Sequence, residues 1–563
     1  MRLQSRAAAV FAAIAVLASC SREPDAVKPT KNVIFMLTDG TSEGALAAAR
    51  WYQRYMTGDY TFNLNLDPYV CGLVQTHESD CPITCSAPGM SAYMTGVLGR
   101  MGNVSIHPEP HPGQDFYPVD PERAWQPAAT VLEAARYWKG KSTGLVCTVT
   151  FPHATPGAAS AHLARRWNYH DIALQQACEG LDLVFGSGRA VLTDEMRGMI
   201  AETGATLLED DVDAFRAFDK GRLWAIFGQD MTDFELDRDP ATQPSLSEMT
   251  AKALDLLSRS GNRNGFFLMV EGSKVDYGAH SRDPMELITE LLEFDRAVKV
   301  CMDFAKKDGN TTVVFVPDHG NCGIQIGGGG YDDYETNPVD SVYAGLRNCR
   351  SSSWKMVERL QSCREGEIPA VFSEWTGITL RPAELKAIKA NMSRTEGDYM
   401  KVSDSYNLQS VICDIYLSRS HLNIIGGQHT GEDVFFGVYN PRGQRPSGVI
   451  RNVALNEYVC RVLGLPKPLD ALTDELYAPH DRVFEGSVCS VAAKTPELGD
   501  AGEAPVLTVE GDGGVKLQIP AYHNMVIRTR GGAVDTVRTR AQCVYMPENG
   551  KFYVDASLAK LLD

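Results

Sequence analysis

Three short strings of this sequence carry carboxylates and imidazoles at the spacing of metal ligands. The strings occupy positions 270–280, 317–320 and 427–431. Asp276 and His280 lie four residues apart, so one turn of helix can direct both side chains at a single ion. Asp318 and His319 directly follow the apolar run 312–316, which is typical of a buried strand. Each string alone is typical of a loop salt bridge or a helix cap, but their joint occurrence predicts metal-assisted hydrolysis.

Ser86 is the candidate nucleophile. Small residues and a helical pattern follow it as far as Gly96. The amides and the dipole of a helix that begins there would stabilise an alkoxide and a bound phosphoryl oxygen. The alternative is that Ser86 only caps this helix, which is the common role of a serine in front of a helical segment.

Strand and helix patterns alternate along most of the chain. Strands are predicted at 31–38, 143–149, 181–185, 265–270, 311–316 and 433–439. Helical periodicity lies between several of them, most clearly over 284–307. This alternation predicts an α/β fold with a doubly wound, mostly parallel sheet that is flanked by helices. The candidate ligands would then lie at the carboxyl ends of the strands.

The pattern divides the chain into four regions. We predict a signal peptide over 1–20, a tether over 21–30, the α/β domain over 31–475 and a small β-rich C-terminal module over 476–563. Positions 324–426 interrupt the rhythm of strands and helices with a glycine run and mixed short segments. We interpret them as an insertion at the rim of the site.

The first twenty residues have the layout of an export signal. Arg2 and Arg6 precede the apolar run 7–17, and the string Leu-Ala-Ser-Cys at 17–20 resembles a bacterial lipobox. This layout predicts cleavage before Cys20, lipidation of its sulfur and a protein that is lipid-anchored in the bacterial cell envelope, periplasmic or on the outer membrane. An ordinary secretory peptide with a stray cysteine is the alternative.

Charge and cysteine content limit the possible partners. The formal net charge is −17, so no long-range positive field would draw a nucleic acid or an anionic membrane. We therefore expect no nucleic-acid partner, and contact with the membrane only through the N-terminal lipid. An anionic substrate must be captured locally, by metal ions or by a placed arginine. The 14 cysteines allow disulfides in an exported chain, and Cys349 and Cys363 could close a small loop.

Several motifs occur in the order seen in one enzyme family. They are Asp39-Gly40, Ser86-Ala87 with the distal Thr95-Gly96, His153-Ala154-Thr155-Pro156 with His162 and Arg166, Glu271-Gly272 to His280, Asp318-His319 and His429-Thr430-Gly431. In these motifs the chain resembles the alkaline phosphatases of the three-metal type. The resemblance covers residues 31–465 and leaves the C-terminal module outside.

The resemblance implies two zinc ions and one magnesium ion. One zinc ion would be held by Asp276, His280 and His429. The second zinc ion would be held by Asp39, Asp318 and His319, with Ser86 as the nucleophilic ligand. The magnesium ion would be held by Asp39, Thr155 and Glu271. Imidazole-rich sets suit zinc and all-oxygen sets suit magnesium, so this division is chemically sensible.

The resemblance also implies an activity, which is hydrolysis of small phosphate monoesters through a phosphoserine intermediate. Arg166 would hold two phosphoryl oxygens through its planar fork. Cys85 departs from the family pattern, because many members carry an aspartate there that orients this arginine. His153 and Tyr277 fill neighbouring places where the family varies, and they would tune metal occupancy and the pH optimum.

Three alternatives are weighed against this interpretation. A sulfatase of the same superfamily needs a Cys/Ser-x-Pro-x-Arg string, and neither Cys85 nor Ser86 begins one. A phosphodiesterase with two metals would not need Thr155 and Glu271. A non-catalytic phosphate-binding lipoprotein would be free to lose Ser86 or a ligand, and none is missing from the sequence. We expect a monomer or a homodimer.

Overall fold

The computed structural model describes residues 27–327, 338–492 and 504–562. The predicted signal peptide, Cys20 and most of the predicted tether lie outside these residues, so their assignment stays a prediction. No helix of the described segments combines the length and the apolar character that crossing a membrane requires.

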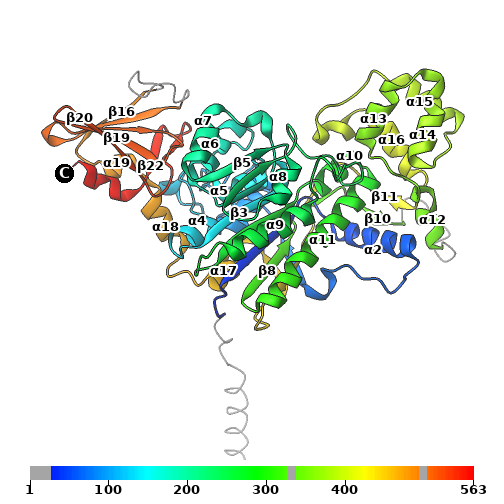
Figure 1. The fold of residues 1–563 in the computed structure, drawn as a ribbon, viewed down its shortest axis with the longest axis horizontal. Coiled ribbons are helices and arrows are strands. Elements are labelled where there is room, and N and C mark those ends of the chain that lie inside the picture. Colours follow the sequence, from blue (N-terminus) through cyan, green and yellow to red (C-terminus); the bar gives the residue numbers. More distant parts are fainter. Residues whose placement is uncertain (1–26, 328–337, 493–503, 563) are drawn as a thin grey trace, which may run out of the picture.

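A ten-stranded sheet forms the centre of the molecule (Figure 1). Its order is β14 (Gly448–Arg451), β2 (Val70–Gln75), β13 (Val434–Tyr439), β8 (Thr311–Val316), β1 (Asn32–Thr38), β7 (Phe266–Gly272), β3 (Ser142–Thr150), β4 (Leu183–Ser187), β6 (Arg222–Ile226) and β5 (Ala205–Glu209). The strands run parallel except β13, which is antiparallel to both β2 and β8. The predicted α/β class with a mostly parallel sheet is confirmed.

Helices cover both faces of the sheet, and the alternation of side chains along β1 shows why. Val33, Phe35 and Leu37 belong to one buried cluster, whereas Ile34 and Met36 belong to the other. The first cluster packs against α3 (Ser86–Thr95), α4 (Val131–Tyr137), α5 (Ala154–Ser160), α6 (Tyr169–Glu179), α7 (Asp194–Glu202) and α17 (Asn452–Leu463). The second packs against α2 (Glu43–Thr57), α8 (Val212–Ala217), α9 (Leu246–Arg259), α10 (Val275–Ser281) and α11 (Pro284–Asp308). Strands that are buried on both faces explain the continuous apolar runs of the sequence.

The segment predicted as an insertion forms a helical group beside the main sheet. β10 (Gln325–Ile326) pairs with β11 (Leu422–Asn423), so the two ends of the segment lie side by side. Between them are α12 (Val339–Tyr343), α13 (Ser353–Ser362), α14 (Ile368–Thr376), α15 (Pro382–Asn391) and α16 (Leu408–Leu417). Figure 1 shows α13 to α16 at the upper right.

The suggested disulfide between Cys349 and Cys363 is wrong, because both cysteines are free. The ten-residue helix α13 lies between them in sequence. A straight helix of that length rises about 15 Å, whereas the Cα atoms of a disulfide lie within about 7 Å.

The C-terminal segment contains two small antiparallel sheets, at the left of Figure 1. One consists of β16 (Val488–Ala492), β17 (Val506–Glu510), β18 (Lys516–Pro520), β19 (Met525–Arg530) and β20 (Ala533–Arg538). The other consists of β15 (Ala478–Pro479), β22 (Lys551–Val554) and β21 (Val544–Met546). The helices α18 (Leu469–Leu476) and α19 (His480–Val483) connect these sheets to the main body.

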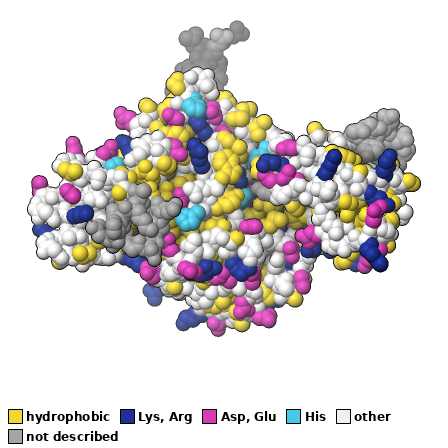
Figure 2. All heavy atoms as spheres, turned by 90° about the horizontal axis from the view of Figure 1, so that it is seen from above, with side chains coloured by type: hydrophobic (Ala, Val, Ile, Leu, Met, Phe, Trp, Pro, Cys, Tyr) yellow, Lys and Arg dark blue, Asp and Glu magenta, His cyan; other side chains and the backbone are white. Residues whose placement is uncertain are grey.

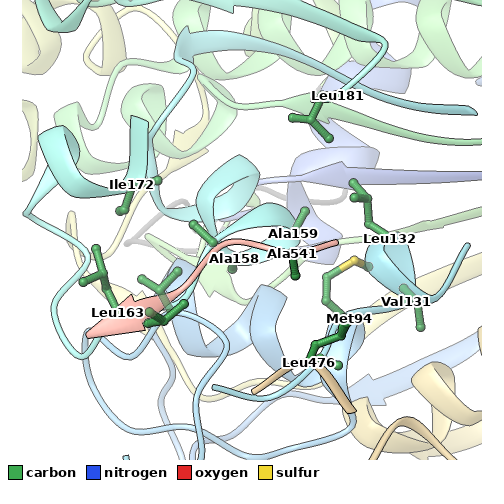
Figure 3. Close-up of a cluster of buried hydrophobic side chains, with 14 of the residues drawn as sticks. Met94, Val131, Leu132, Ala158, Ala159, Leu163, Ile172, Leu181, Leu476 and Ala541 are labelled. Carbon is green, nitrogen blue, oxygen red and sulfur yellow. The ribbon is translucent and has the colours of Figure 1, made fainter. Parts of the chain in front are cut away.

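One hydrophobic cluster joins the C-terminal segment to the α/β body. Figure 3 shows Leu476 and Ala541 beside Met94, Val131 and Ala158, which come from α3, α4 and α5. All five side chains are buried. The C-terminal sheets therefore share a core with the main sheet.

We expect Leu476→Ala to lower the free energy of unfolding by about 2–5 kcal/mol, because it leaves a cavity in this shared cluster. Urea denaturation followed by tryptophan fluorescence measures the change. Val534→Ala, on an exposed position of β20, is the control and should shift the midpoint little. Equal midpoints for the two variants would show that the cluster does not couple the C-terminal sheets to the body.

Candidate functional site

The predicted ligands gather at one edge of the main sheet, where β1, β7 and β8 end. Asp39 directly follows β1, and Asp318 comes two residues after the end of β8. Glu271 is the penultimate residue of β7. Since β1 is parallel to β7 and to β8, the three strands deliver these carboxylates to the same edge.

A small antiparallel ladder adds the most distant ligand. The strand β12 (His429–Thr430) pairs with β9 (Gly320–Asn321), which places His429 opposite Asn321. The ring of His429 stacks on that of His319, with the centroids 3.7 Å apart. This pairing brings His429, which follows the insertion in sequence, next to the residues at the end of β8.

Asp276, His280 and His429 form the first ligand group. One potential ligand atom from each lies within 4.8 Å of the others. Asp276 Oδ2 is 3.3 Å from His280 Nε2, and the Nε2 atoms of His280 and His429 are 3.1 Å apart. The helix α10 places Asp276 and His280 on the same face, as their spacing predicted.

Asp39, Asp318 and His319 form the second group, and Ser86 lies beside it. His319 Nε2 is 3.6 Å from Asp39 Oδ1 and 3.3 Å from Asp318 Oδ2. Ser86 is the first residue of α3, and its Oγ is 3.4 Å from both Asp39 Oδ1 and His319 Nε2. The structure thus brings the candidate nucleophile to this group.

Asp39, Glu271 and His153 form the third group. One potential ligand atom of each lies within 4.8 Å of the others. His153 thus lies among the potential ligands, whereas the sequence predicted a neighbouring, non-ligating place for it. Thr155 is buried in the first turn of α5, which begins directly after His153. Asp39 is a member of both the second and the third group, which agrees with its place in both ligand sets that the resemblance implies.

Burial and mutual repulsion shift the proton affinities of these side chains. Burial, followed by the charge of Asp318, raises the pKa of Asp39 well above its usual value. Burial raises the pKa of Glu271 to about 8 and that of Asp318 to about 7. Burial also opposes the ionisation of Asp276, but the neighbouring imidazoles, His280 above all, hold its pKa below the usual value. Divalent cations between these groups would favour their ionised forms.

The hydrogen bonds of the histidines fit metal ligation. His280 Nδ1 donates to the carbonyl oxygen of Gly427 at 2.6 Å, and His429 Nδ1 donates to that of Thr84 at 2.9 Å. Each imidazole therefore turns the lone pair of Nε2 towards the cluster. Two acceptor nitrogens at 3.1 Å suit a shared cation and do not suit a direct contact.

Unpartnered oxygens support the same interpretation for the other two groups. Within the described residues, Asp39 Oδ2, Thr155 Oγ1 and both carboxylate oxygens of Glu271 are buried and have no partner in good hydrogen-bond geometry. Buried polar atoms ordinarily have partners, and a cation coordinated by oxygen ligands would satisfy all four atoms. The residues present therefore fit metal ions at all three groups.

Arg166 lies at the mouth of the cluster and is buried. Its Nη1 is 3.6 Å from Cys85 Sγ, and its Nη2 is 3.3 Å from His153 Nε2. Burial, followed by the charge of Arg166, lowers the pKa of His153 to about 3, so this imidazole is neutral. Tyr277 is buried, and its ring lies 6.3 Å from that of His153. The guanidinium thus contacts a thiol and a neutral imidazole.

Sequence reasoning missed two side chains that support the site. Asn321 Nδ2 donates to Asp276 Oδ1 at 2.8 Å, and Glu78 Oε1 accepts from the backbone N–H of Cys85 at 3.1 Å. Burial raises the pKa of Glu78 to about 7. The position of Asn321, three residues after Asp318, was a usable signal, whereas nothing in the local sequence marked Glu78.

Comparisons with known proteins agree with this geometry. A sequence model described as alkaline phosphatase matches residues 30–184 and 188–465. Alkaline phosphatase 4 of Bacillus subtilis is 28% identical over 448 residues, which cover 77% of this chain and 88% of that protein.

Solved structures show the same fold. The alkaline phosphatase of Thermus thermophilus has a TM-score of 0.67 at 22% identity, and the match covers 80% of this chain and 96% of that one. The cold-active enzyme of a Shewanella species has a TM-score of 0.66 at 22% identity, with 77% and 100% covered. The family model spans well over half of the sequence, and the ligand groups fall inside the matched residues. This chain belongs to the alkaline phosphatase family of enzymes.

Proposed function

We propose that this protein hydrolyses phosphate monoesters through a phosphoserine at Ser86, in a site that holds two zinc ions and one magnesium ion. One observation carries the proposal: the Ser86 hydroxyl lies 3.4 Å from Asp39 and from His319, at the start of α3. A serine that only capped the helix would have no reason to lie among buried metal-ligand groups.

The side chains divide the work as follows. Ser86 Oγ donates its hydrogen bond to Asp39 Oδ1, which holds the hydroxyl beside the second ligand group. Arg166, buried beside Cys85 and His153, binds two nonbridging oxygens of the phosphoryl group and so orients phosphorus for attack by Ser86 Oγ. Ser86 is the first residue of α3, so the positive end of the helix dipole would stabilise the negative charge that develops there.

The reaction has two displacements. Ser86 Oγ forms a bond to phosphorus while the ester oxygen leaves as the alcohol, and a water molecule then attacks phosphorus and releases inorganic phosphate together with free Ser86. Two inversions give net retention at phosphorus. The bound cations supply Lewis-acid charge that stabilises the attacking and departing oxygens of a dianionic ester.

The ligand sets support the metal assignment. Asp276 with His280 and His429, and Asp39 with Asp318 and His319, combine imidazole and carboxylate donors in the manner that suits zinc. Glu271 and Thr155 add oxygen donors next to Asp39, which suits magnesium. His153 lies beside these oxygen donors and is neutral, so it adds no charge to the set.

Substrate choice and metal dependence test the proposal together. We expect an aryl phosphate to be hydrolysed in preference to the matching diester and sulfate, and we expect chelation to abolish the activity. Zinc plus magnesium should restore it after chelation. Release of the chromogenic phenol measures all three substrates. Monoesterase activity that survives complete removal of metal would overturn the mechanism.

Ser86→Ala tests the nucleophile. We expect turnover to fall by at least about 1,000-fold, because the first displacement loses its attacking atom. Incorporation of radiolabelled phosphate into acid-quenched protein should disappear as well, while the zinc content by mass spectrometry stays equal to that of the wild type. A variant that still forms the phosphoenzyme would remove Ser86 from the mechanism.

Cys85→Asp tests how Arg166 is held. A carboxylate in place of the thiol should orient the guanidinium and lower the inhibition constant for inorganic phosphate several-fold, because the thiol gives only a weak contact at 3.6 Å. Cys85→Ser has a similar size without the charge and is the control. If the constant is the same in all three proteins, Cys85 does not determine phosphate affinity.

A further inference from the structure

A pocket of about 710 Å³ opens to solvent beside the ligand groups. His280, His429, Cys85 and Arg166 form part of its lining, so it is the approach to the site described above. Its volume falls within the usual range for pockets that enclose a small organic molecule. The phosphoryl group occupies only its inner end, and the remaining space must receive the rest of the ester.

The outer part of this pocket is apolar. Ile83, Met101 and Trp167 belong to its lining, and they expose 43%, 58% and 57% of their surfaces. On the face seen from above, Figure 2 shows hydrophobic side chains gathered near the middle of the molecule. Single exposed hydrophobic residues are common, but three large ones around the approach to a reaction centre form a patch that calls for a ligand.

The backbone holds Trp167 firmly at this place. The N–H of Arg166 donates to the carbonyl oxygen of Gly102 at 2.9 Å. Gly102 has φ +80°, and a Cβ atom built there would lie 3.0 Å from Trp167 Cζ3, so the indole ring packs against this glycine. Trp167 therefore follows the phosphate-binding arginine directly, and Met101 precedes the glycine on which the ring rests.

Ile83 lies on the side of the pocket that carries His429. A Cβ atom built at Gly431 would lie 3.3 Å from Ile83 Cγ1, so this side chain packs next to the loop that carries His429. The pocket thus has apolar side chains both on the Arg166 side and on the His429 side. A flat group that leaves from phosphorus would pass between these two walls.

The charges of the lining do not favour a second anionic group on the substrate. Arg100 is in the lining, but it makes ion pairs with both Asp80 and Asp115. The other basic side chain at the rim, His111, also lies beside Asp80. An ester with a further phosphate would therefore meet cations whose charge is already balanced by carboxylates.

We propose that Ile83, Met101 and Trp167 form a subsite for the leaving group, which takes aromatic and other flat apolar alcohols. The subsite rests on the proposed function, because Arg166 and Ser86 must first fix the phosphoryl group. It makes aryl phosphates better substrates than monoesters of polyols, sugars or nucleotides. Trp167 supplies the stacking surface, and Ile83 and Met101 exclude water from its two sides.

Two esters and four proteins test the subsite. For the wild type we expect kcat/KM to be higher for 1-naphthyl phosphate than for glycerol 2-phosphate. Trp167→Ala should reduce this preference about tenfold, mainly through a higher KM for the naphthyl ester. Trp167→Phe should keep most of it. Trp51→Ala removes another exposed tryptophan, on α2 and outside the pocket lining, and should leave the preference unchanged.

Two outcomes would overturn the subsite. The first is an unchanged preference in Trp167→Ala, whether neither ester or both esters equally lose activity, and the second is the same loss of preference in Trp51→Ala. An equal loss would show that Trp167 only positions Arg166.

A binding measurement separates failure of the subsite from failure of the proposed function. If the wild type hydrolyses neither ester, the proposed function fails, and calorimetry with two phosphonates still decides the subsite. We expect 1-naphthylphosphonate to bind the wild type about tenfold more tightly than methylphosphonate and to lose this advantage in Trp167→Ala. Equal or unmeasurable affinities in the wild type would overturn the subsite.

Discussion

Four carboxylates, those of Asp39, Glu271, Asp276 and Asp318, are buried together at the end of the central sheet. Burial raises the pKa values of Asp39, Glu271 and Asp318, so without cations these carboxyl groups bind protons more readily. The surrounding histidines add little positive charge, because burial lowers the pKa values of His153, His319 and His429. Divalent cations would keep the carboxylates ionised, and the rest of the site can be understood as the means to hold such cations.

The scaffold supplies this charge at low conformational cost. Asp39, Glu271 and Asp318 come from the ends of three adjacent parallel strands, whose alternating side chains are fixed in two hydrophobic clusters. The imidazoles are oriented by backbone carbonyl groups, so no flexible side chain must be ordered to aim them. The backbone at Gly40 also lies very close to Asp276, because a Cβ atom at Gly40 would be 2.1 Å from Asp276 Oδ1. A rigid site of this kind loses little entropy when ions bind.

Much of the fold could be predicted from the sequence because it depends on local patterns, and so could part of the candidate site. The places of Asp39, Thr155 and Glu271 in the ligand sets followed from the family resemblance. Asp276 and His280 share one helical turn, and Asp318 follows an apolar strand, so their spacing alone predicts a common direction. The membership of His153 in a ligand group, the bond from Asn321 to Asp276 and the bond from Cys85 to Glu78 depend on tertiary contacts that no spacing reveals. The predicted Cys349–Cys363 disulfide was wrong for a related reason. The number of residues between two cysteines does not reveal that a helix, here α13, holds them apart.

The strand β1 separates the start of the described chain from the reaction centre. It begins one residue after Lys31 and ends next to Asp39, and its seven residues span about 23 Å. The described chain therefore enters at the edge of the sheet opposite the reaction centre, at the lower side of Figure 1. The described chain thus begins about one strand length away from Asp39, and the approach to the ligand groups lies at the other end of the strands.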